Sequence, residues 1–152
     1  MNDTRLYRMP FWWRPCEVAL TNLRKNERQI RVIEEAYMQP GSSLKEICVK
    51  GGGTNDLMAI TIDRMSADSY LARLKHEKKA IEMTNRIMIS AYGLQGGNDR
   101  LRLIEMLYVK ATHSMVGVCE ALNISISSAK RYRAQYMWCL AKGLGYEPAV
   151  ES

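Results

Sequence analysis

The stretch MVGVCEALNISISSAKRYRA, residues 115–134, carries the strongest structural signal in the chain. Val118 and Leu122 recur at helical spacing, which predicts a short helix with one apolar face. Cys119 supplies a small side chain where a following helix would cross most closely. A short first helix of this kind must be followed by a tight turn if a second helix is to pack against it.

The residues after this helix have the properties that such a turn requires. Asn123 tolerates the left-handed backbone better than most residues, and Ile124 then adds an apolar side chain to the core. Ser125 is a typical N-cap for the next helix, in which Ala129 and Tyr132 are expected to face inward. Residues 115–134 are therefore predicted to form a helix-turn-helix.

The second helix of this unit carries polar and basic side chains on its predicted outer face. In DNA-binding proteins the second helix of such a pair enters the major groove. Arg131 suits bidentate contact with guanine, whereas Lys130 and Arg133 suit phosphates. The candidate DNA-binding residues are Ser125, Ser127, Ser128, Lys130, Arg131, Arg133 and Gln135. The alternative is that these side chains only solvate an amphipathic helix.

Composition narrows the possible function classes. The 152 residues carry a net charge of +6, which favours an anionic partner, although the excess is spread evenly along the chain. The four cysteines lie far apart and only two histidines are present, so neither a zinc site nor another cofactor is expected. Because no acidic pair or nucleophile–base arrangement stands out, an enzyme is the least favoured class.

The distribution of apolar residues predicts a cytoplasmic protein. No uninterrupted apolar run reaches the roughly 18 residues that a membrane span needs. The N-terminus contains arginines but no apolar signal-peptide core. The cysteines are then expected to be reduced and mostly buried.

The N-terminal part is predicted to be helical and to end in a linker. Apolar residues, among them Val18, recur at helical spacing from Pro15 to Tyr37, where Pro40 and Gly41 would end the helix. Residues 39–56 contain QPGSS and GGGTND, which predict a glycine-rich linker or hinge.

The remainder of the chain is also predicted to be helical. A long helix is expected from an N-cap at Ser66 to Tyr92, with Leu71, Leu74, Ile81, Met88 and Ala91 as its apolar stripe. Gly93 would stop it, Gly96 and Gly97 would form a turn, and Asn98 or Asp99 would cap a helix through Tyr108. The final helix is expected to reach Leu144.

The fold class expected is therefore all-α, with two regions. Residues 1–57 form a helical N-terminal region with the glycine-rich linker, and residues 58–152 form a C-terminal helical DNA-binding domain. The helix-turn-helix at residues 115–134 belongs to the second region.

An aromatic cluster near the N-terminus has two interpretations. Phe11, Trp12 and Trp13 are followed by Arg14. Large aromatic side chains are mostly buried, so the favoured interpretation is packing of the first helix onto the core. The alternative is a partner surface made by Phe11, Trp12, Trp13 and Arg14, because Trp and Arg are enriched at interfaces. Base stacking is a weaker third option.

Residues from about 66 to 147 resemble the ArpU/RinA-type phage transcriptional regulators, whose C-terminal part is similar to the sigma-factor region that reads the −35 promoter element. The segments that carry the resemblance are DSYLARLKHEKKAIE, DRLRLIEMLYV, ALNISISSAKRYRAQ and CLAKGLGYE. As in that family, a helix ending in a tyrosine, here Tyr108, precedes the motif. The resemblance implies that Ser127, Ser128, Lys130 and Arg131 read promoter DNA.

The resemblance implies a phage or prophage regulator that activates late genes through promoter binding and contact with RNA polymerase or its sigma factor. Two alternatives are an antitermination factor acting on polymerase and a small terminase-like DNA-packaging subunit. The expected partner is double-stranded DNA, with no membrane association. Both a monomer and a homo-oligomer remain compatible with this function, because a dimer suits a palindromic operator and a sigma-like reader works alone.

Overall fold

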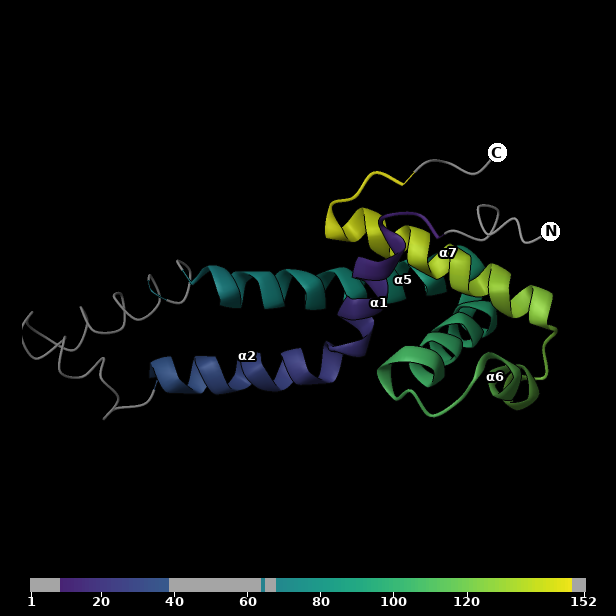
Figure 1. The fold of residues 1–152 in the computed structure, drawn as a ribbon, viewed down its shortest axis with the longest axis horizontal. Helices are drawn as coiled ribbons and strands as arrows, with labels where there is room; N and C mark the ends of the chain where they lie inside the picture. The colour runs from purple at the N-terminus through teal and green to yellow at the C-terminus, as the bar shows by residue number, and fades with distance from the viewer. Residues whose placement is uncertain (1–8, 39–63, 65–67, 149–152) are drawn as a thin grey trace, which may run out of the picture. The chain divides into compact units, whose positions relative to one another are not determined.

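A computed structural model describes residues 9–38, 64 and 68–148, and within these ranges the chain is all-helical (Figure 1). The prediction that the chain is all-α is thus confirmed for the described residues. The elements are α1 Trp13–Thr21, α2 Leu23–Met38, α5 Ser69–Ile104, the π-helix η1 Glu105–Val109, α6 Met115–Leu122 and α7 Ile126–Leu144.

The chain divides into two compact units. One combines Met1–Leu23 with Lys79–Ser152, and the other is Arg24–Lys78. Helix α5 contributes its first residues to the second unit and the rest to the first. The predicted linker at residues 39–56, the boundary between residues 57 and 58 and the predicted cap Ser66 lie outside the described residues.

The smaller unit is an antiparallel pair made by α2 and the start of α5. Its core consists of Ile30, Leu71 and Leu74, with Ile33 packed against them. Three polar contacts run along the pair: Asn26 Nδ2 donates to Glu77 Oε2 at 3.0 Å, Lys75 pairs with Glu34 at 2.7 Å, and Tyr37 donates to Asp68 at 3.1 Å. Because the partners of successive α2 residues run backwards along α5, the two helices are antiparallel.

The single helix predicted from Pro15 to Tyr37 is in fact two helices. Asn22 separates α1 from α2 with φ −92° and ψ 1°, a conformation between helix and strand that interrupts the helix axis. Val18, one of the apolar residues whose spacing predicts that helix, is 41% exposed. Pro15 lies in the first turn of α1, where a missing N–H leaves no hydrogen bond unmade.

Helix α5 is interrupted at Gly93, where the sequence predicts a stop. Gly93 has φ 81° and ψ 173°, a conformation essentially restricted to glycine. The predicted turn at Gly96 and Gly97 is wrong, since both lie in the helix that resumes after Gly93. Gly97 allows close packing across the break, because a Cβ there would come within 2.6 Å of Ile89 Cα.

Two further predictions for this region are wrong. Asn98 and Asp99 lie inside the resumed helix and do not cap it, and Ala91 is exposed. The helix expected through Tyr108 ends as an α-helix at Ile104 and continues as the π-helix η1. Leu71, Leu74, Ile81 and Met88 are buried, as predicted.

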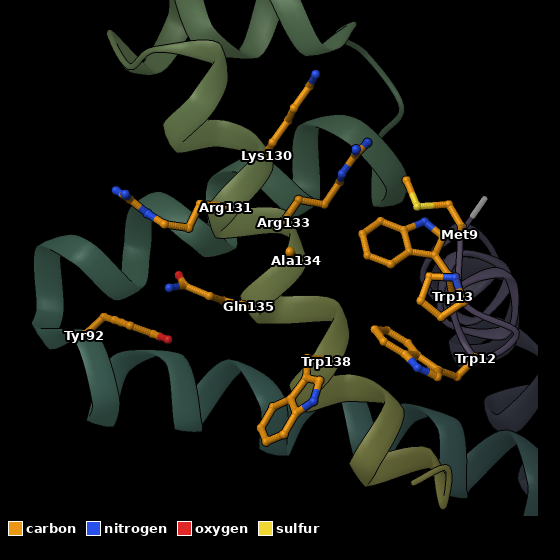
Figure 2. Close-up of a pocket in the computed structure, with 11 residues that line it drawn as sticks. Met9, Trp12, Trp13, Tyr92, Lys130, Arg131, Arg133, Ala134, Gln135 and Trp138 are labelled. Atoms are coloured by element: carbon orange, nitrogen blue, oxygen red, sulfur yellow. The ribbon is translucent and has the colours of Figure 1, made fainter. Parts of the chain in front are cut away.

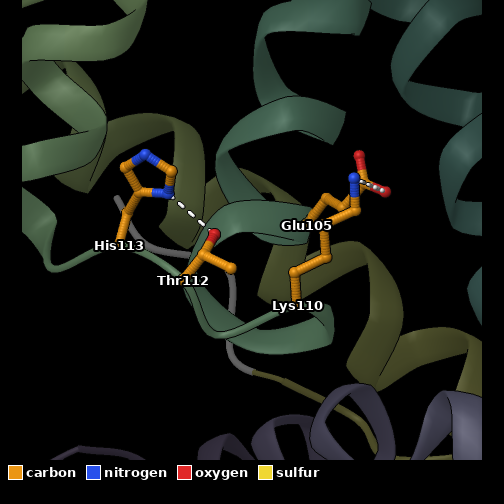
Figure 3. Close-up of polar contacts among 4 residues, drawn as sticks. All are labelled: Glu105, Lys110, Thr112 and His113. Carbon is orange, nitrogen blue, oxygen red and sulfur yellow. Dashed lines mark hydrogen bonds and ion pairs between the residues drawn. The ribbon is translucent and has the colours of Figure 1, made fainter.

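The segment between η1 and α6 is a loop held by local contacts (Figure 3). Lys110 Nζ pairs with Glu105 at 3.4 Å, and the Thr112 hydroxyl shares a hydrogen bond of 2.8 Å with Nδ1 of His113. The backbone N–H of Thr112 also donates to the carbonyl of Met106 at 3.0 Å. These contacts fix where α6 begins relative to η1.

The core of the larger unit is formed where α1, η1 and α6 pack with α7. Its fully buried side chains include Leu20 from α1, Leu103 from α5 and Val118 from α6, together with Tyr136 and Met137 from α7. The hydroxyl of Tyr136 donates to Asn85 Oδ1 at 2.6 Å. Helix α7 is thus held from several sides, and only part of its surface is left for a partner.

Candidate nucleic-acid interface

A tight turn at Asn123 sets the direction in which α7 leaves α6. Asn123 adopts the left-handed conformation (φ 55°, ψ 50°), as predicted. The N–H of Ile124 donates to the carbonyl of Cys119 at 3.0 Å, and the N–H of Asn123 donates to that of Glu120 at 3.4 Å. This pair of bonds is the Schellman arrangement, which satisfies carbonyls left open at a helix end.

Ser125 caps α7, as the sequence predicts. Its hydroxyl oxygen accepts from the N–H of Ser128 at 3.1 Å, and the hydroxyl also donates to the Ser128 hydroxyl at 3.0 Å. Ser114 caps α6 in the same way by accepting from the N–H of Gly117 at 3.2 Å. Both helix starts are therefore stabilised locally, each cap by about 1 kcal/mol.

The first turns of α7 leave three candidate side chains exposed. Ser127, Lys130 and Arg131 are open to solvent, and the capping residue Ser125 is exposed beside them. In Figure 2, Arg131 and Arg133 extend to opposite sides of α7. The exposed set lies at a helix N-terminus, where backbone N–H groups and the helix dipole favour an anion.

Three other predicted contact residues are less accessible. Ser128 is half-buried, and its hydroxyl accepts the bond from Ser125. Gln135 is also half-buried, and its Oε1 accepts a hydrogen bond of 2.9 Å from Nε of Arg100. Arg133 is half-buried and lies over the ring of Trp13, 5.3 Å from its centroid. These side chains therefore have intramolecular contacts in the free protein.

Arg100 is a residue of this region that the sequence does not reveal. Its side chain is buried, and its guanidinium lies 3.6 Å from the Tyr92 ring centroid and 4.0 Å from that of Tyr132. It also donates to the carbonyl of Gly96 at 2.8 Å. Arg100 thereby joins the resumed part of α5 to the middle of α7. Nothing in the segment NDRLRLI distinguishes it from an exposed arginine such as Arg102.

Arg133 stands close to the phenol of Tyr108. Burial raises the pKa of Tyr108 to about 12, although the positive charge of Arg133 acts in the opposite direction. Nε of Arg133 is buried and has no acceptor among the described residues. Arg133 is therefore part of the packing between α7 and its neighbours.

The aromatic cluster at the N-terminus is divided between core and surface. Trp12 and Trp13 are 7% and 6% exposed and belong to the core of the larger unit, which is the favoured interpretation from the sequence. The alternative prediction, an exposed partner surface made by Phe11, Trp12, Trp13 and Arg14, is wrong for Trp12 and Trp13, because both are buried. Phe11 is 76% exposed, with its ring against Tyr146, and the side chain of Arg14 is also exposed.

Two other kinds of feature are absent from the described part of the chain. No group of three or more His, Cys, Asp or Glu side chains there is arranged to hold a metal ion. None of its helices combines the length and the apolar character needed to cross a bilayer.

Comparison with known proteins adds no relative. No family model matches the chain, and neither the curated proteins nor the solved structures contain a match. The function is therefore inferred from the chemistry of α6, the Asn123 turn and α7.

Proposed function

We propose that the protein is a sequence-specific DNA-binding regulator that reads double-stranded DNA with a helix-turn-helix made by α6, the Asn123 turn and α7. The first turns of α7 would enter the major groove. Arg131 would contact a base, because its guanidinium can pair with guanine in a bidentate manner, and Lys130 and Ser127 would contact phosphates.

One observation carries this proposal: the only cations on the first two turns of α7, Lys130 and Arg131, are both exposed beside a capped helix start. Ser125 closes the cap, and Asn123 sets the direction of the helix. A helix N-terminus with exposed cations and hydroxyls next to it matches the chemistry of a phosphate backbone.

The more specific proposal is that this regulator activates phage or prophage late genes through contact with RNA polymerase or its sigma factor. It is supported by the resemblance of residues 66–147 to the ArpU/RinA-type regulators and rests on that resemblance alone. Run-off transcription from a template that contains the bound DNA site, with and without a terminator, measures the effect. An activator increases initiation, whereas an antitermination factor increases readthrough.

Binding of a DNA duplex, followed by fluorescence anisotropy, tests the proposed role of each side chain. Arg131→Ala should weaken binding to the preferred site by about 1–3 kcal/mol and relax the preference at one base pair. Lys130→Ala should weaken binding to all sequences and reduce the slope of log affinity against log salt by about 1.

Arg102→Ala provides the matched control, because Arg102 is an exposed arginine on α5 outside the proposed interface. It should leave the preference for the specific site unchanged. Equal losses for the Arg131 and Arg102 variants would show that only net charge matters and would refute base reading by α7.

A further inference from the structure

A cavity of about 590 Å³ lies over one face of α7, with Trp12 and Trp13 on one side of the helix and Tyr92 on the other (Figure 2). All three tryptophans of the chain, Trp12, Trp13 and Trp138, contribute to its lining. Ala134 also lines it, and its small side chain leaves room above the helix backbone. Every lining residue belongs to the larger unit.

The charged groups at this cavity all have the same sign. Lys130, Arg131 and Arg133 line it, and no aspartate or glutamate is among the lining residues. Lys130 and Arg131 are exposed, and Nε of Arg133 lacks an acceptor among the described residues. An occupant with apolar and negatively charged groups would complement both the tryptophans and the cations.

The ring contacts decide between two anionic occupants. A single-stranded nucleic acid would need open aromatic faces on which its bases could stack. Arg100 covers the Tyr92 ring at 3.6 Å, and Lys142 lies 4.3 Å from the centroid of the Trp138 ring. Trp12 and Trp13 are each less than a tenth exposed, and the guanidinium of Arg133 lies 5.3 Å from the centroid of the Trp13 ring, so both form closed walls. Walls of this kind suit an inserted apolar side chain better than a stacked base.

We infer that this cavity is a docking groove for a segment of a partner protein that carries a large apolar side chain flanked by aspartate or glutamate. The apolar side chain would lie over Ala134 between the tryptophans. The neighbouring carboxylates would pair with Arg131 and Lys130, where Arg can bind a carboxylate in a bidentate manner. This docking function does not depend on whether α7 also reads DNA.

Selection from a random-peptide phage library on the full chain tests the inference, because the library samples apolar and acidic residues in many different combinations. Enriched peptides should combine a large apolar residue with acidic neighbours. Because all three tryptophans line the cavity, a synthetic copy of an enriched peptide should change the intrinsic tryptophan fluorescence on binding. A library that yields no enriched peptide, or peptides without acidic residues, would overturn the inference.

Ala134→Leu fills the floor of the groove without changing any charge. This variant should bind the enriched peptide at least about tenfold more weakly than the unmodified chain does. The control Ala72→Leu, at an exposed alanine in the smaller unit, should leave the affinity for the peptide unchanged. The duplex affinity of the Ala134 variant, measured in parallel, should be that of the unmodified chain. Peptide binding can therefore fail while duplex binding persists, and the reverse, so the two proposals are tested separately.

Arg131→Glu is a second variant, chosen because an exposed position on α7 does not put folding at risk. It should lower the affinity for the acidic peptide about tenfold or more, and it should bind peptides with lysine in place of the acidic residues more tightly than the unmodified chain does. Unchanged binding in both the Ala134 and Arg131 variants would place the peptide elsewhere and overturn the inference. If an oligo-dT strand binds the unmodified chain and does not bind the Ala134→Leu variant, the groove binds nucleic acid and the inference is overturned.

Discussion

Nε of Arg100 donates a hydrogen bond of 2.9 Å to Oε1 of Gln135, and this contact connects the resumed part of α5 with the middle of α7. The same guanidinium lies between the rings of Tyr92 and Tyr132. A buried cation is stable only when its donors are satisfied and its charge is compensated. Here a side-chain amide, a backbone carbonyl and two aromatic rings supply that compensation, and α7 is held in place as a result.

Gln135→Ala should therefore lower the free energy of unfolding by about 1–3 kcal/mol, because a buried charged donor loses its acceptor. Urea unfolding followed by circular dichroism measures the change. Arg102→Ala, at an exposed position, should stay within about 0.5 kcal/mol of the unmodified chain. A Gln135 variant as stable as the Arg102 variant would show that the contact contributes little.

The Asn123 turn should discriminate between side chains by backbone strain. Asn123→Val should lower the free energy of unfolding by about 1–2 kcal/mol, because a β-branched residue is poorly accommodated in the left-handed conformation of residue 123. Asn123→Gly should be tolerated, since glycine adopts this conformation without steric cost. Thermal unfolding of the two variants checks the prediction, and a valine variant as stable as the glycine variant would contradict the turn geometry.

Two neighbouring glycines should respond differently to alanine. Gly97→Ala would place a Cβ within 2.6 Å of Ile89 Cα, so it should destabilise the chain by about 1–3 kcal/mol through overpacking. At Gly96 the nearest atom is Arg100 Nη1 at 3.4 Å, so alanine fits there and should stabilise the helix by about 0.5–1 kcal/mol. Denaturant unfolding should show a lower free energy of unfolding for Gly97→Ala and a higher one for Gly96→Ala. Destabilisation of both variants would show that the helix does not resume as described.

Cys16 gives an expectation for alkaline pH. Burial, together with the nearby charge of Glu17, raises the pKa of the Cys16 thiol from 9.0 to about 12. The folded state keeps this proton in a range where the unfolded chain releases it. Its contribution to stability is therefore complete below about pH 9 and is lost as the pH rises towards 12.

The free energy of unfolding should fall between about pH 9 and pH 11, with a contribution from this thiol of at most about 1.4 kcal/mol per pH unit. Cys16→Ala should reduce that slope without abolishing it, because burial also raises the pKa of Tyr136. Chemical denaturation at several pH values gives the slopes. Identical slopes in the variant and the unmodified chain would mean that Cys16 is not protected from solvent.

The sequence predicts the helical class and the local geometry of α6 and α7 because short-range chemistry determines both. Ser125 and Asn123 act through hydrogen bonds and backbone conformation within a few residues of themselves. The stop at Gly93 is predicted for the same reason. The helix that resumes directly after it is missed, because Gly97 is favoured there by contact with Ile89 and not by its own propensity.

For the candidate interface, the sequence predicts only the residues that the structure leaves exposed on α7. A helical projection of α7 does not show that Arg133 packs on Trp13 or that Gln135 binds Arg100, because both partners lie far away in the sequence. The groove is missed for the same reason. Trp12 and Trp138 line it from distant parts of the sequence, and only the tertiary fold brings them to one cavity.

Selection of duplex DNA from a random pool, carried out in parallel with the unmodified chain and with Arg131→Ala, tests the central claim most directly. Reading of DNA by α7 predicts one enriched sequence motif for the unmodified chain, and the same motif with one base pair relaxed for the variant. No enriched motif, or an identical motif for both proteins, would contradict the claim that α7 reads DNA through Arg131.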